Sequence, residues 1–313
     1  TLASIINDAP INQWDSSSGV AWRPQNSPAV YEGPIRLRVA LGMSKNVVSV
    51  RLLRGVGLDD TVDYISRFGF DKDEIPRNET MSLGSGSHTP LEVVSGIAVL
   101  ANGGFAVRPF FIERIENDLG ELLWQAEPVY ACNPCDVEVQ QQKQSVDEAD
   151  IEAMLAAEFS QATVNGLQNK KFKQSAEQVI SPQTAFLVTE MMRTAVKANG
   201  NWNNKTYWLG TGWRARNLLQ RDDIGGKTGT TNDSKDTWFS GFAGNLVATA
   251  WVGFDDASRQ LGRVSRNQNL VNKNPEKFNW IGNAVIGVED GAKGAQPAWI
   301  RFMEVVLKDQ PEV

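Results

Sequence analysis

One short string of this sequence combines a fixed positive charge, hydroxyl groups and glycines in a pattern that could bind a carboxylate. It covers residues 225–233 and reads Gly-Gly-Lys-Thr-Gly-Thr-Thr-Asn-Asp. Lys227 supplies the charge, and Thr228 and Thr230 supply hydroxyl donors for charge-assisted hydrogen bonds. Gly229 has no side chain and leaves space for a substrate to lie against the strand backbone. The string therefore predicts the carboxylate-binding edge of an active site.

Two other interpretations fit part of this string. A β-hairpin edge with a solvated lysine would have the same three residues Lys227, Thr228 and Gly229, so these alone do not decide. A phosphate-binding P-loop also ends in Gly-Lys-Thr, but it needs a further glycine five residues before the last one. That position is Arg221, which excludes the P-loop.

A second candidate element is Ser44-Lys45-Asn46. It interrupts a run of apolar residues at helical spacing between Ile35 and Gly57, which predicts two helices joined by a tight turn. Such a turn can aim Ser44 and Asn46 into a cleft. A Ser-x-Asn tripeptide is common by chance, so its weight comes from its place ahead of the Lys-Thr-Gly string.

Further helices and strands that could position these elements have local start and stop signals. Residues 1–34 are rich in Pro, Ser and Asn and are expected to be loop-dominated. Expected helices run from an Asp59 cap to Phe68, from a Thr89–Glu92 capping box to Leu100, from Ser181 to Val196, and from Gln296 with Trp299, Phe302, Val305 and Val306 on its apolar face. Expected strands lie within 106–124, which turns at 118–120, and at 224–231, 237–242 and 246–254.

The expected fold class is α/β (α+β), with helices on an antiparallel sheet. Residues 1–125 form the first part of the domain and 179–313 the second. Residues 126–178 are polar and rich in Gln, Glu, Asp and Lys, which predicts a peripheral insertion with a helix near 147–159.

Composition and charge exclude some classes of partner. The net charge is −6 and the pI is near 5.1, so no excess of basic residues exists to bind a nucleic-acid backbone. No apolar stretch approaches the roughly 18 residues of a membrane span. The chain begins at Thr1 without Met, which is expected of a cut into a longer protein.

No metal site and no cofactor are predicted. The two cysteines, Cys132 and Cys135, lack further ligands for zinc, and a small disulfide loop is the preferred interpretation over a redox motif. The single histidine, His88, follows Ser87 without an evident acid partner, so a structural or surface role is expected rather than a catalytic one.

Longer strings resemble one family. Residues 83–92 (Leu-Gly-Ser-Gly-Ser-His-Thr-Pro-Leu-Glu), 101–104 (Ala-Asn-Gly-Gly) and 226–239 are similar to class A high-molecular-weight penicillin-binding proteins. Residues 4–10 and 22–26 fit the Gram-negative 1A branch of that family. Lys-Thr-Gly on an edge strand is also an element that these proteins share with serine β-lactamases. Nothing here supplies a recognisable base for a deacylating water, which disfavours a β-lactamase.

The resemblance implies a penicillin-binding transpeptidase, serine β-lactamase-like fold and a peptidoglycan DD-transpeptidase that cross-links stem peptides and is the target of β-lactams. It implies a parent that is also a glycosyltransferase, is periplasmic, and is tethered to the inner membrane by an absent N-terminal anchor. Its partners would be D-Ala-D-Ala stem peptides, β-lactams, and further copies or regulatory lipoproteins. The alternative from another class is a non-catalytic module of the same fold that binds peptidoglycan peptides or partner proteins.

The same resemblance assigns roles to single residues. Ser44 would relay protons, Asn46 would orient the donor, and Lys227 would support the relay and the substrate carboxylate, which Thr228 and Thr230 bind. The family's nucleophile lies in a Ser-x-x-Lys element, and no serine of this sequence has a lysine three residues later. The chain alone is therefore expected to be inactive.

Overall fold

The computed structural model describes residues 1–15, 20–131, 174–200, 203, 207–256, 258–261, 279–281, 284–286 and 290–313. Its α-helices are α1 (Leu37–Gly42), α2 (Asn46–Val56), α3 (Leu58–Ser66), α4 (Pro90–Ala101), α8 (Pro182–Ala195), α9 (Trp213–Leu219) and α11 (Ala295–Val306). Two short 3₁₀ helices, η1 (Glu79–Leu83) and η2 (Asn232–Ser234), complete the described helices.

The strands lie in small sheets around one three-stranded sheet. They are β1 (Ile5–Asp8), β2 (Gln13–Asp15), β3 (Val20–Trp22), β4 (Gly33–Arg36), β5 (Phe105–Ala106), β6 (Arg114–Glu116), β7 (Leu122–Gln125), β8 (Val129–Tyr130), β9 (Gln174–Ser175), β10 (Glu177–Gln178), β11 (Ala198–Asn199), β12 (Trp208–Leu209), β13 (Gly225–Thr230), β14 (Asp236–Ala243), β15 (Leu246–Gly253), β16 (Asn279–Ile281) and β17 (Ala284–Ile286).

The central sheet has the order β13-β14-β15 and is antiparallel throughout. The β14–β15 hairpin closes through Gly244, whose φ of 57° lies in the left-handed region that glycine adopts without strain. Lys227 on β13 lies opposite Ser240 on β14, and Ser240 in turn lies opposite Thr249 on β15. The sheet and its register therefore place the lysine on the outer strand of this sheet.

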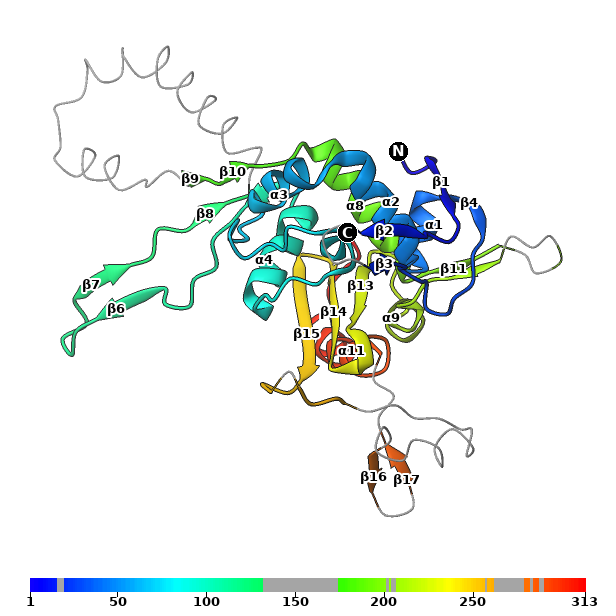
Figure 1. Cartoon of the computed structure of the whole chain (residues 1–313). Coiled ribbons are helices and arrows are strands. Elements are labelled where there is room, and N and C mark those ends of the chain that lie inside the picture. Colours follow the sequence, from blue (N-terminus) through cyan, green and yellow to red (C-terminus); the bar gives the residue numbers. More distant parts are fainter. Residues whose placement is uncertain are drawn as a thin grey trace, which may run out of the picture.

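Helices cover both faces of this sheet (Figure 1). The ring of Phe239 packs edge-on against that of Trp299 on α11 at 4.9 Å, and the indole N–H of Trp299 donates to Ala248 O. Phe242, three residues along the strand, points to the opposite face because side chains alternate, and there it lies near the end of α4 and the side of α8. The main core gathers on the α11 side, around Ile224, Phe239, Trp299 and Met303.

Several sequence-based predictions are confirmed. Two helices flank the Ser44 turn, the three central strands lie where they were expected, and β6 and β7 form the predicted hairpin. The capping box of α4 is complete, because Thr89 accepts from Glu92 N and the Glu92 carboxylate accepts from Thr89 N. Ser181 caps α8 by accepting from Thr184 N.

The loop-dominated segment 1–34 is confirmed, and its extended parts pair as β1 with β4 and β2 with β3. Two predictions need correction. The helix α3 begins after Gly57, not at an Asp59 cap, and ends at Ser66. On α11, Trp299 is buried but Phe302 is 51% and Val305 74% exposed. The core face of α11 carries Ala295, Gln296, Trp299, Ile300 and Met303 at helical spacing, and Val306 packs against this core as predicted.

Other predictions fall outside the described residues. These are the Cys132–Cys135 disulfide loop and the helix near 147–159. The division of the chain into two parts of one domain with an insertion at 126–178 stays a prediction. Among the described helices, none is long and apolar enough to cross a bilayer.

Candidate functional site

The position of β13, and so of Lys227, depends on the two glycines that precede this lysine, because side chains there would collide with β14. A Cβ at Gly225 would lie 2.3 Å from the ring of Phe242, and one at Gly226 would lie 2.7 Å from the ring of Phe239. Both distances are shorter than any real side-chain contact, so the glycine pair lets β13 approach the aromatic side chains of β14. The first two residues of the Gly-Gly-Lys-Thr-Gly string therefore serve packing, and the chemistry begins at Lys227.

Lys227 and Ser44 meet across 183 residues of sequence. Lys227 Nζ donates a hydrogen bond to Ser44 Oγ at 2.9 Å, and a second one to Thr228 O at 2.7 Å. Ser44 occupies the turn between α1 and α2 with a φ of 55°, an uncommon conformation for a residue other than glycine. Strained backbone of this kind clusters at functional sites. The structure thus brings together the Lys-Thr-Gly string and the Ser-x-Asn turn, which are far apart in the sequence.

The ammonium of Lys227 has an altered acidity. Burial removes water from the charged form and lowers the pKa of Lys227 from 10.5 to about 8. The lysine is still mostly protonated at neutral pH, so it can hold a carboxylate there. Its charge is lost as the pH rises through about 8.

This pKa shift predicts a pH dependence of stability. In the unfolded chain Lys227 has its ordinary pKa, so between pH 8 and 10.5 the unfolded state binds more protons than the folded state. The free energy of unfolding should therefore rise with pH in this window, by about 2 kcal/mol from pH 7.5 to 10. Urea unfolding at both pH values measures the change, and Lys227→Met should lack this increment. Equal pH dependence in the two proteins would contradict the shifted pKa.

The hydroxyls of Thr228 and Thr230 each have a defined partner. Thr228 Oγ1 donates to Thr211 Oγ1 at 2.8 Å, and Thr230 Oγ1 accepts from Gly291 N at 2.9 Å. Thr211 lies just before α9, and its own backbone N–H donates to Gly42 O at the end of α1. Sequence analysis missed Thr211, which no motif marks. It connects the strand of Lys227 to the turn of Ser44.

Among the described residues, no hydrogen bond joins the side chain of Asn46 to Ser44 or Lys227. It is the first residue of α2, and its Nδ2 donates to Gln25 O at 2.8 Å. Its amide thus anchors the segment before β4, and its amide oxygen has no hydrogen-bond partner among the described residues. Gly229 lies opposite Trp238, and the backbone of Gly291 approaches it so closely that a Cβ on Gly291 would lie 2.6 Å from Gly229 O.

The middle residue of Ser44-Lys45-Asn46 points into the protein. Lys45 is 6% exposed and its ammonium lies 3.2 Å from the carboxylate of Asp8, which is 0% exposed. It also donates to Val30 O at 3.0 Å, and Glu32 lies at 3.5 Å.

Asn26 completes this buried polar group. Its Nδ2 donates to Asp8 Oδ1 at 2.7 Å, and its Oδ1 accepts from Val47 N, in the first turn of α2. The second oxygen of Asp8 accepts from Glu32 N at 3.1 Å. We name Asp8, Asn26, Glu32 and Lys45 the anchor cluster. It ties the Ser44 turn to β1 and to the segment before β4, and sequence analysis did not find it.

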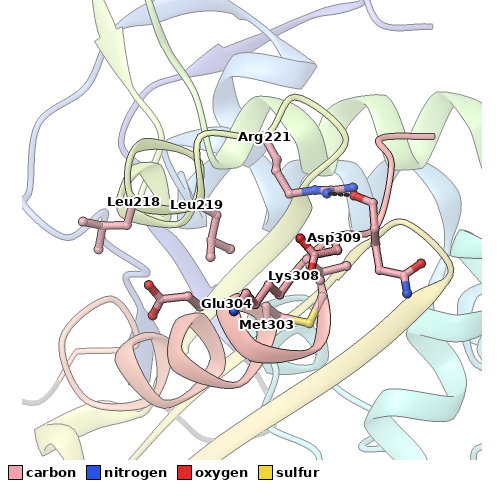
Figure 2. A pocket seen from close by; sticks show the side chains of 9 residues that line it. Leu218, Leu219, Arg221, Met303, Glu304, Lys308 and Asp309 are labelled. Atoms are coloured by element: carbon pink, nitrogen blue, oxygen red, sulfur yellow. Dashed lines mark hydrogen bonds between the residues drawn. The ribbon is translucent and has the colours of Figure 1, made fainter.

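A pocket at some other place than the Lys227–Ser44 contact is formed in part by the C-terminal segment. It lies between the end of α9, α11 and residues 308–310, and Arg221 lines it (Figure 2). Arg221 donates to the carbonyls of Gln310 and Pro311 and pairs with the buried Asp223. The pocket contains neither Ser44 nor Lys227, so the candidate site is defined by the Lys227–Ser44 contact instead.

Comparisons with known proteins give the family. Residues 3–261 match the family described as "Penicillin binding protein transpeptidase domain". The chain is 47% identical over 311 residues to penicillin-binding protein 1A of Vibrio cholerae, covering 99% of this chain and 34% of that protein. It is 43% identical to penicillin-binding protein 1A of Escherichia coli, covering all of this chain and 36% of that protein.

Solved structures agree with these relatives. The crystal structure of penicillin-binding protein 1A from Haemophilus influenzae matches with a TM-score of 0.76 and 38% identity, over 100% of this chain and 40% of that one. The fold is also that of PonA1 from Mycobacterium tuberculosis in complex with penicillin V, with a TM-score of 0.61, 18% identity, and coverage of 100% of this chain and 65% of that one. The chain spans about a third of the length of the curated relatives it matches. It belongs to the penicillin-binding protein transpeptidase-domain family.

Proposed function

We propose that this chain forms the carboxylate-binding and proton-relay side of a serine-type peptidoglycan DD-transpeptidase. The observation that carries the proposal is the 2.9 Å hydrogen bond from Lys227 Nζ to Ser44 Oγ. It joins the Lys-Thr-Gly strand to the Ser-x-Asn turn, two elements that the sequence places 183 residues apart.

The substrate group that fits β13 is the carboxylate of a terminal D-alanine. The Lys227 ammonium supplies the opposite charge, and a charge-assisted hydrogen bond contributes about 1.5–3 kcal/mol. Thr228 and Thr230 supply hydroxyls. Since Thr230 Oγ1 accepts from Gly291 N, its own O–H proton stays available to donate to the ligand. A bound carboxylate would also raise the pKa of Lys227 and keep the lysine charged.

The hydrogen-bond direction at Ser44 suits a relay. Ser44 Oγ accepts from the ammonium of Lys227, so its own proton can be donated to another group. A serine from a Ser-x-x-Lys element would give its proton to the lysine of that element, attack the carbonyl before the terminal D-alanine and break its C–N bond. The leaving nitrogen would take the proton of Ser44, and the lysine of that element would return a proton to Ser44. An amine of a neighbouring stem would then resolve the ester and form the cross-link.

Two further roles follow from this chemistry. The backbone N–H of Thr230 would supply one donor of an oxyanion hole, with the N–H of the nucleophilic serine as the other. The amide of Asn46, whose Nδ2 donates to Gln25 O, would orient the donor peptide through its remaining oxygen. β-Lactams would use the same contacts as the donor.

The intact protein is proposed to combine this activity with a glycosyltransferase domain, in the periplasm and tethered to the inner membrane. Copies of itself or regulatory lipoproteins are the proposed partners. These proposals rest on the class of the relatives.

Covalent labelling with a fluorescent penicillin tests the proposed function. The 313 residues alone contain no Ser-x-x-Lys element and should give no adduct on a denaturing gel or by intact mass. A protein in which these residues follow such an element should be labelled on its serine. An adduct on Ser44 would contradict the relay assignment. A natural protein whose upstream segment lacks the element and does not label would instead be a non-catalytic binding module.

A further inference from the structure

Three side chains that can bind a metal ion converge beside α4, away from β13. Glu74 follows α3 in a turn, His88 precedes α4, and Glu92 belongs to the first turn of α4. One ligand atom from each lies within 4.8 Å of the others. Nothing in the proposed transpeptidase chemistry uses these residues.

The imidazole of His88 is held in place by packing. Its ring lies against that of Phe70, with 4.8 Å between the ring centroids. A Cβ at Gly86 would lie 2.4 Å from His88 Nε2, so the ring fills the space that this glycine leaves open. His88 Nδ1 is buried and has no hydrogen-bond partner among the described residues. A buried polar atom without a partner is costly and uncommon, and a ligand that it binds removes that cost.

The two glutamates differ in how they are held. Glu92 Oε2 accepts from Thr89 N and Thr89 Oγ1, and these hydrogen bonds lower the pKa of Glu92. They leave Oε1 without a hydrogen-bond partner among the described residues. Glu74 is exposed and ends the acidic run Asp71-Lys72-Asp73-Glu74, which adds negative potential on that side.

We propose that Glu74, His88 and Glu92 bind a divalent transition-metal ion, with Zn²⁺ as the preferred ion. Zinc accepts both imidazole nitrogen and carboxylate oxygen as ligands, whereas calcium and magnesium prefer oxygen ligands alone. Tetrahedral zinc with ligands at about 2.0–2.2 Å places them roughly 3.4 Å apart. The ligand atoms lie within 4.8 Å of one another, so side-chain rotations would have to bring them closer on binding, and the exposed Glu74 has the most freedom to rotate.

The bound ion would join the turn after α3 to the start of α4. Because α4 packs against β14 and β15, this connection reaches the sheet that carries Lys227. With three protein ligands, a water would take the fourth position of a tetrahedral ion. An ion that binds only the folded state should raise the thermal midpoint.

Calorimetric titration of the untagged full chain with Zn²⁺ tests the proposal. Cys132→Ser/Cys135→Ser is the background, so that the cysteines cannot bind the ion. We expect one equivalent of Zn²⁺ and a higher Tm. Since the sequence has a single histidine, NMR signals of His88 should report binding at this residue alone.

Single substitutions separate metal binding from folding. Glu74→Gln changes an exposed residue, and Glu92→Gln keeps an acceptor for the capping box. Each should weaken Zn²⁺ binding at least tenfold while the metal-free Tm stays close to that of the parent. Glu113→Gln, an exposed acid before the β6–β7 hairpin, is the control and should bind as the parent does. The proposal is overturned if zinc does not bind, or if it binds equally to all variants without shifting the His88 signals.

Discussion

Replacement of Lys227 by alanine should slow acylation by penicillin at least tenfold in a protein that also contains the Ser-x-x-Lys element. The ammonium is the charged group of the site, and a charge-assisted hydrogen bond to the ligand carboxylate contributes about 1.5–3 kcal/mol. The substitution also removes the donor to Ser44 Oγ, so the relay loses its fixed geometry. Stopped-flow or gel-based acylation rates measure the effect.

Lys235→Ala is the matched control for Lys227→Ala. Lys235 is an exposed lysine just before β14, and its loss should leave the acylation rate unchanged. A pH profile adds a second criterion: acylation that depends on protonated Lys227 should decline as the pH rises through the pKa of Lys227 in the free enzyme, about 8. Unchanged acylation by the Lys227→Ala protein would remove β13 from the active site.

Asp8→Asn should destabilise the fold by about 3–5 kcal/mol, because it leaves the buried ammonium of Lys45 without its closest counter-ion. Asparagine keeps the size of the side chain and an oxygen that accepts from Asn26, but its amide nitrogen cannot accept from Glu32 N, so the loss combines the charge with one hydrogen bond. Urea unfolding gives the free energy. The turn that contains Ser44 should also become more mobile, because the ion pair of Lys45 with Asp8 connects this turn to β1.

A double substitution distinguishes a broken ion pair from a packing defect. Asp8→Asn combined with Lys45→Met removes both charges and should recover most of the lost stability, because well-packed apolar groups often replace a buried pair without cost. Asp59→Asn is the control, since the exposed pair of Asp59 with Arg77 should contribute little. Additive losses in the double variant would contradict a Lys45–Asp8 interaction.

Local signals predicted much of the secondary structure correctly. The Thr89–Glu92 capping box and the Ser181 cap are satisfied within one helical turn, so the residues that make the contact are neighbours in sequence. The prediction was wrong on the outer face of α11, where two stripes at nearly the same helical spacing were both apolar. Trp299 belongs to both stripes, and only tertiary packing decides that Ile300 and Met303 are buried while Phe302 and Val305 are exposed.

At the candidate site, too, the local strings were predictable from the sequence and the contacts between them were not. The Lys-Thr-Gly string and the Ser-x-Asn turn were recognisable as strings, and the family was recognisable from them. Their contact was an expectation until the fold placed Ser44 Oγ 2.9 Å from Lys227 Nζ. Asn46 was expected to orient the donor, and this stays a prediction; its Nδ2 donates to Gln25 O, a contact that the sequence did not indicate.

By itself the sequence determined the residue types of the site, the helix starts, the central strands and the family, because each depends on contacts or strings within about ten residues. Tertiary structure alone decided the anchor cluster, the link through Thr211 and the grouping of Glu74 with His88 and Glu92. It also decided the lowered pKa of Lys227, since desolvation depends on every segment that surrounds the ammonium. The physical reason is range: a buried charge is paired or desolvated by side chains from distant parts of the chain, and no local pattern specifies which ones.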